Sequence, residues 1–181
     1  MNLQTGDIGA TKGKGFLGWT NRKLFSPTTD RFHFLILWKP WGRGDFLILE
    51  SISKGLAVGL LSWYKGKDIE FYRVNCDEDL RAAAPDGLVE WGRARYDYLL
   101  FIKLLAGVLV ALAKILWKEH KLRKLRAEDL PYGVNSSLIC TEACDVAFDS
   151  CGVAVISLGV IPIPSAFKTA ELEGRMTRIE E

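Results

Sequence analysis

The apolar run from Phe32 to Trp38 is the feature that most constrains the fold. It reads FHFLILW, and His33 is its one polar side chain. Such a run is typical of a strand that is buried on both faces, because neither face presents polar side chains to solvent. A turn with proline and glycine at 39–44 separates it from a second run, DFLILE at 45–50. Two strands joined by a short turn predict an antiparallel pair.

Weaker patterns predict further strands and helices, and the length predicts a single domain over residues 1–181. Further strands are expected at 6–11, 69–74 and 153–158. One helix is expected over 77–84, with Asp77 as its cap and with Pro85 and Gly87 as its end. A second helix should begin near Cys140, after capping side chains at 135–137, and should run to about Phe148.

The most apolar stretch lies at 98–117, and a basic run follows it at 118–126. We call 98–126 the apolar-basic segment and expect a long helical insertion there. Lys103 and Lys114 are three helical turns apart, so they share one face of a wide apolar helix. Three placements remain open: a helix or lid packed on the domain, a helix lying in a membrane interface, and a membrane span.

Composition limits the classes of function. A formal net charge of +2 gives no reason to expect a nucleic-acid partner. Residues 1–10 lack the pattern of a signal peptide, so we expect a cytoplasmic protein with reduced thiols, either free or peripheral to a membrane. Cys140 and Cys144 are four residues apart and have no histidine nearby in sequence, so we expect neither a metal nor another cofactor.

Three residues stand out for their chemistry. A thiol at Cys140, in the first turn of a helix, loses its proton more readily than a free one. An imidazole inside an apolar strand, as at His33, needs a polar partner, and Glu50 on the neighbouring strand can provide one. Each also has a structural interpretation: Cys140 as a buried core thiol, His33 as a core histidine bonded to a carbonyl, and Glu50 as a strand-end carboxylate in solvent.

The order of these residues resembles the permuted NlpC-type, or YiiX-type, papain-like family. The resemblance rests on five short motifs and covers roughly residues 6–168, including Pro164-Ser165. The motifs are Gly6-Asp7-Ile8-Gly9, His33-Phe34-Leu35-Ile36, Leu49-Glu50-Ser51, Tyr96-Asp97 and Cys140-Thr141-Glu142. It implies a papain-like α+β domain, in which an antiparallel sheet packs against the nucleophile helix.

The resemblance also implies roles for individual residues. Cys140 would be the nucleophile, His33 the base and Glu50 the residue that orients the imidazole, while Tyr96 would help to place the substrate or an oxyanion. The chain departs from the family at Phe32, where a small residue is usual, at Thr141, where serine is usual, and in the apolar-basic segment.

These observations favour a cysteine hydrolase that cleaves amide bonds in a peptide or cell-wall peptide through a thioester. A second hypothesis keeps the catalytic residues and changes the substrate to a lipid, as in an acyltransferase, phospholipase or thioesterase similar to the lecithin retinol acyltransferase relatives of the superfamily. The apolar-basic segment is the feature that favours it. A third hypothesis is a catalytically silent binding module.

Overall fold

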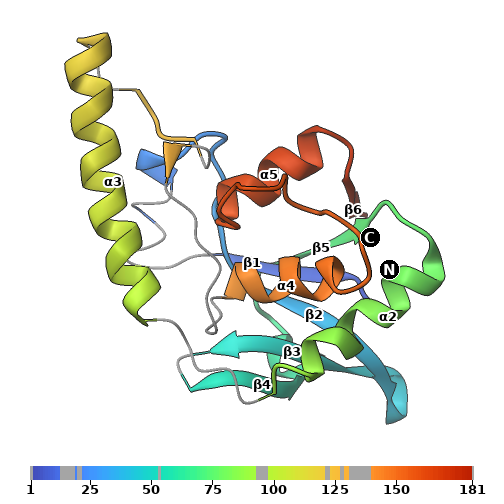
Figure 1. The fold of residues 1–181 in the computed structure, drawn as a ribbon. Helices are drawn as coiled ribbons and strands as arrows, with labels where there is room; N and C mark the ends of the chain where they lie inside the picture. Colours follow the sequence, from blue (N-terminus) through green and yellow to red (C-terminus); the bar gives the residue numbers. More distant parts are fainter. Residues whose placement is uncertain are drawn as a thin grey trace.

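The computed structural model describes residues 2–12, 19, 22–52, 54–92, 98–120, 123–126, 129–130 and 140–180. Six strands form one antiparallel sheet in the order β4-β3-β2-β1-β5-β6. They are β1 (Ile8–Lys12), β2 (Arg31–Trp41), β3 (Asp45–Ile52), β4 (Gly55–Leu60), β5 (Ile69–Val74) and β6 (Met176–Ile179). The helices are α2 (Glu78–Val89), α3 (Tyr98–Glu119), α4 (Cys140–Asp149) and α5 (Pro164–Leu172), with short 3₁₀ turns η1 (Gly42–Gly44) and η2 (Leu61–Tyr64). In Figure 1, α2, α4 and α5 lie over the sheet, whereas α3 stands to one side.

Strand β2 is the buried interior strand that its sequence predicts. Phe34 to Leu37 are each 2% exposed or less, and β2 pairs antiparallel with β3. Phe34 and Ile36 join the main core with side chains of the helices, whereas Leu35 and Leu37 join a second cluster that contains Tyr64. Burial on both faces explains why this run is continuously apolar. The α+β class and the antiparallel pairing are confirmed.

Two irregularities interrupt the pairing of β2. Thr11 pairs with His33 and Lys12 with Arg31, so Phe32 is an extra residue without a partner on β1. Trp38 is likewise extra opposite β3. Each is a β-bulge, which bends a strand and releases main-chain groups from the ladder. The bulge at Phe32 lies directly beside His33.

Two sequence predictions about helices and strands are wrong. Helix α2 continues through Pro85 and Gly87 to Val89. The packing of α2 against the rest of the fold offsets the loss of the main-chain hydrogen bond that proline cannot donate. Residues 153–158 are not a strand. There Asp145 accepts a hydrogen bond from the Ile156 N–H at 3.1 Å, and Arg175 donates one to the Val155 carbonyl at 2.6 Å. Side chains thus take the main-chain groups that a sheet would have used.

The apolar-basic segment is not one continuous helix over 98–126. Helix α3 ends at Glu119, and His120 follows with a positive φ of 53°. Beyond it, Leu125 forms a bridge with Phe25 instead of a further helical turn. The prediction of a long apolar helical insertion over 98–126 is therefore wrong. No helix in the described part of the chain is long and apolar enough to cross a membrane.

A tight contact joins the N-terminal turn to α2. Gly6 has a φ of +85°, its N–H donates to the Leu37 carbonyl at 2.8 Å, and a β-carbon there would lie 2.0 Å from the Arg81 carbonyl oxygen. The next residue, Asp7, is fully buried and accepts two hydrogen bonds from Arg73 at 2.9 and 2.7 Å. The Gly6-Asp7 motif therefore anchors β1 against α2 and β5.

We predict that Gly6→Ala lowers the free energy of unfolding by at least about 2 kcal/mol more than Gly66→Ala does. Gly66 is the matched control, because its φ is +80° and a β-carbon there meets nothing within 4 Å. The control substitution carries only the backbone cost of about 1 kcal/mol. Urea denaturation of the two variants measures the difference, and equal losses would contradict the contact.

Candidate active site

Pairing between β2 and β3 brings His33 and Glu50 together. Leu35 lies opposite Glu50 in the register, so His33 is the diagonal neighbour of Glu50 on the same face of the sheet. The His33 Nε2 and a Glu50 carboxylate oxygen are 2.6 Å apart. Glu50 is only 8% exposed, which excludes the interpretation of a strand-end carboxylate in solvent.

Helix α4 brings the third predicted residue to the same place. Cys140 is its first residue and is 8% exposed. The thiol lies 3.6 Å from the Phe32 carbonyl oxygen, to which it can donate, and this is the carbonyl of the bulged residue in β2. The thiol also lies close enough to His33 to contribute to the raised pKa of its imidazole. Because Glu50 holds Nε2, Nδ1 is the ring nitrogen left for Cys140.

The environment favours the charged imidazole. Burial opposes the positive charge, but hydrogen bonds and charge interactions with Cys140 and Glu50 outweigh it and raise the pKa of His33 to about 9. A buried histidine without such partners would have a lowered pKa. His33 is therefore an imidazolium through the neutral range, held between a thiol and a carboxylate.

Tyr64 completes this arrangement, and sequence reasoning missed it. Its hydroxyl donates to the same Glu50 oxygen at 2.5 Å, and its ring stacks parallel to His33 with centroids 6.4 Å apart. Lys67 places its ammonium 4.0 Å from the centre of the Tyr64 ring. Tyr64 lies in η2, after an edge strand, and no local pattern marks it as a partner of Glu50.

Tyr64 and His33 together hold Glu50 in its charged form. Burial opposes the carboxylate charge, but the hydrogen bonds from His33 and Tyr64 and the charges of His33 and Lys67 keep the pKa of Glu50 below its ordinary value. Burial and the same hydrogen bond raise the pKa of Tyr64, so it stays a neutral donor. The Glu50 carboxylate thus accepts hydrogen bonds from a protonated imidazole and from a neutral tyrosine hydroxyl.

The remaining predictions have mixed outcomes. Tyr96 lies outside the described residues, so its predicted role stays a prediction. Thr141 and Glu142 are buried beside Cys140. Cys144 is buried one turn further along α4, and burial raises the pKa of its thiol well above the ordinary value. No group of residues able to hold a metal ion occurs in the described part of the chain.

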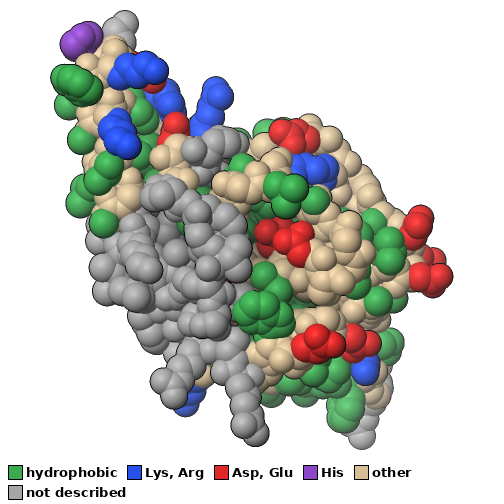
Figure 2. Space-filling view, viewed as in Figure 1, with side chains coloured by type: hydrophobic (Ala, Val, Ile, Leu, Met, Phe, Trp, Pro, Cys, Tyr) green, Lys and Arg blue, Asp and Glu red, His purple; other side chains and the backbone are tan. Residues whose placement is uncertain are grey.

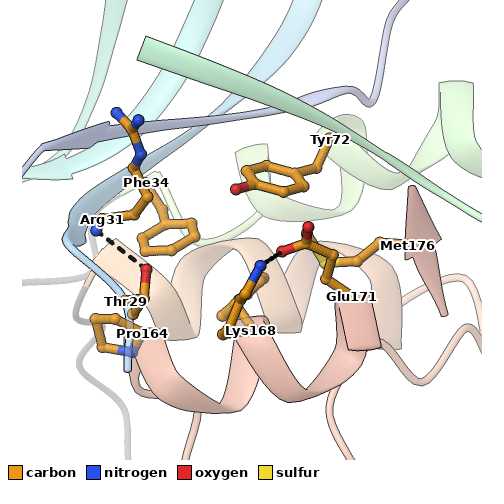
Figure 3. A pocket seen from close by; sticks show the side chains of 9 residues that line it. Thr29, Arg31, Phe34, Tyr72, Pro164, Lys168, Glu171 and Met176 are labelled. Atoms are coloured by element: carbon orange, nitrogen blue, oxygen red, sulfur yellow. Dashed lines mark hydrogen bonds and ion pairs between the residues drawn. The ribbon is translucent and has the colours of Figure 1, made fainter. Parts of the chain in front are cut away.

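A small cavity lies elsewhere, between the sheet and α5 (Figure 3). Phe34 and Tyr72 line it from the sheet, and Lys168 and Glu171 line it from α5, where they form an ion pair of 2.7 Å. Neither Cys140 nor His33 lines this cavity. The candidate active site is therefore defined by its side chains and not by this pocket.

Comparison with protein-family models, curated proteins and solved structures finds no match to this chain. A thiol, an imidazolium and a carboxylate in series have the chemistry to act as a nucleophile, a proton carrier and a group that orients the carrier.

We predict that iodoacetamide alkylates Cys140 faster than Cys76 or Cys144 near neutral pH, and that His33→Ala removes this advantage. Burial raises the pKa of both comparison thiols. The advantage should narrow as the pH rises through about 9, because the imidazolium of His33 exists only below that pH. Mass spectrometry of each cysteine measures the rates. If Cys140 is unreactive while the fold is intact, the thiol is structural.

We predict that Tyr64→Phe raises the pH below which the rate of Cys140 alkylation falls. Loss of the hydroxyl removes one of the interactions that lower the pKa of Glu50, so its carboxylate would be protonated at a higher pH. Tyr72→Phe is the matched control, because Tyr72 is also buried and donates to a different carboxylate, Glu70, at 2.7 Å. An equal shift in both variants would show that the effect is not transmitted through Glu50.

Proposed function

We propose that the protein is a cysteine hydrolase that acts by acyl transfer, with Cys140 as nucleophile, His33 as general base and acid, and Glu50 as the residue that orients the imidazole. The observation that carries the proposal is the position of His33, which contacts Cys140 and is 2.6 Å from Glu50. His33 and Glu50 come from two consecutive strands, whereas Cys140 comes from a helix more than 100 residues further along the chain.

The reaction proceeds in two steps. The Cys140 thiolate attacks the substrate carbonyl carbon, and His33 gives its proton to the leaving amine, so that the amide bond breaks and a thioester forms. Water then attacks the thioester while His33 takes one of its protons, and the acid leaves as the thiolate returns. Main-chain N–H groups at the start of α4 are suitable donors for the oxyanion, since the first N–H groups of a helix have no partner within it.

The fold supports a permuted papain-like assignment. The site combines a strand histidine, a carboxylate on the next strand and a cysteine at a helix start further along the chain, in the order on which the family resemblance rests. The helix packs against the sheet that carries the other two residues. On this assignment the substrate is an amide bond in a peptide or cell-wall peptide.

A lipid-directed acyltransferase, phospholipase or thioesterase is the second candidate. It uses the same three residues, and the observation in its favour is a set of exposed apolar side chains on α3. An ester or a thioester replaces the amide in the first step, and an alcohol or thiol leaves in place of the amine.

The proposal predicts a covalent acyl-enzyme on Cys140. Incubation with peptide amides and with acyl esters, followed by acid quench and intact-protein mass spectrometry, should show the added acyl mass in wild type. Cys140→Ala should not carry it, whereas Cys144→Ser should, because Cys144 is buried in the same helix without contacting His33. The type of substrate that labels Cys140 separates the peptide from the lipid hypothesis. Absence of any adduct with both classes, in a folded protein, would favour a binding module.

A further inference from the structure

Helix α3 has two different apolar faces. Val108, Ala111 and Ile115 are buried in the main core, at spacings of three and four residues. A second set faces solvent, and its members also recur three and four residues apart. We call this set the α3 outer face: Leu109, Val110, Ala113, Leu116 and Trp117. Leu109 is 63% exposed and Trp117 is 85% exposed, so this face has no partner among the described residues.

Two lysines border the α3 outer face. Lys114 and Lys118 are one turn apart along the helix and exposed, and neither forms an ion pair with any residue that the structure describes. Figure 2 shows apolar side chains along this projecting helix, with basic side chains near them. The sequence predicted a longer basic run, but Arg123 is neutralised by Asp129 at 2.7 Å and Lys124 donates to the Thr28 hydroxyl at 2.6 Å. Lys114 and Lys118 therefore place positive charge at the edge of the apolar face, and Lys124 and Arg126 add positive charge beyond the end of the helix.

We propose that the α3 outer face docks on the surface of an anionic lipid bilayer, with the helix lying in the plane of the interface. Leucine and valine enter the acyl boundary, and Trp117 sits at headgroup level, where an amphipathic ring is stable. Lys114 and Lys118 extend their ammonium groups to lipid phosphates while their alkyl chains follow the apolar face. An interfacial helix of this kind does not need the length of a spanning helix.

Charge decides between a bilayer and a second copy of the chain. In a symmetric dimer the same face meets itself, so the lysines of one copy border those of the other. An anionic surface instead offers opposite charge to both lysines. The inference goes beyond the proposed function, because it uses no residue of the candidate active site.

The test is co-sedimentation of the full chain with vesicles, carried out on the Cys140→Ala protein so that no turnover of lipid intervenes. We expect binding to phosphatidylcholine vesicles that contain phosphatidylserine and weaker binding to phosphatidylcholine alone. Trp117→Glu should reduce the partition coefficient about tenfold, and Lys114→Glu with Lys118→Glu should reduce it by a similar factor. Leu158→Glu is the matched control, because Leu158 is 92% exposed and lies outside α3. Circular dichroism confirms that each variant is folded.

Three results would overturn the proposal. The first is no binding to anionic vesicles. The second is binding that Trp117→Glu and Leu158→Glu weaken equally. The third is a concentration-dependent dimer in light scattering that Trp117→Glu abolishes, without vesicle binding, which would assign the face to a second copy. Because all arms use Cys140→Ala, a failure of the proposed catalytic function leaves each result unchanged.

Discussion

The structure of the candidate site depends on one partly buried charge, the imidazolium of His33. A positive charge in a largely buried position is unfavourable unless opposite charges and hydrogen bonds compensate for it. Glu50 and Cys140 provide that compensation from opposite sides of the ring, and this explains why the pKa of His33 rises to about 9 although burial alone would lower it. Removing either partner would take away one of the two interactions that favour the charged ring.

Several other features of the fold serve to hold those partners. The register of β2 and β3 places Glu50 diagonally across from His33. The bulge at Phe32 frees a carbonyl that receives the Cys140 thiol. The Phe32 carbonyl accepts a hydrogen bond from the neutral thiol, whereas a protonated His33 can donate a hydrogen bond to the thiolate, so the sulfur has a suitable neighbour in either state. Tyr64 donates to the same carboxylate oxygen that faces His33, and this second hydrogen bond keeps Glu50 from rotating away.

This series of contacts also separates the site from the rest of the molecule. The cavity beside α5 contains none of the three residues, and the α3 outer face lies on an element that carries none of them. The residues proposed for catalysis and those proposed for membrane docking therefore lie in different parts of the chain. Substitutions can address one without altering the other.

The sequence by itself determined the elements whose patterns are local. A continuous apolar run bounded by turn residues indicates a strand buried on both faces, so β2 and its pairing with β3 were predictable. The approach of Glu50 to His33 was also predictable, because the two residues lie on strands expected to pair. Only the tertiary structure decided that Tyr64 joins them, that Phe32 is bulged, and that α2 continues through Pro85. These depend on contacts between distant segments, such as Phe32 with Cys140, 108 residues apart, and periodicity within one segment carries no information about such distances.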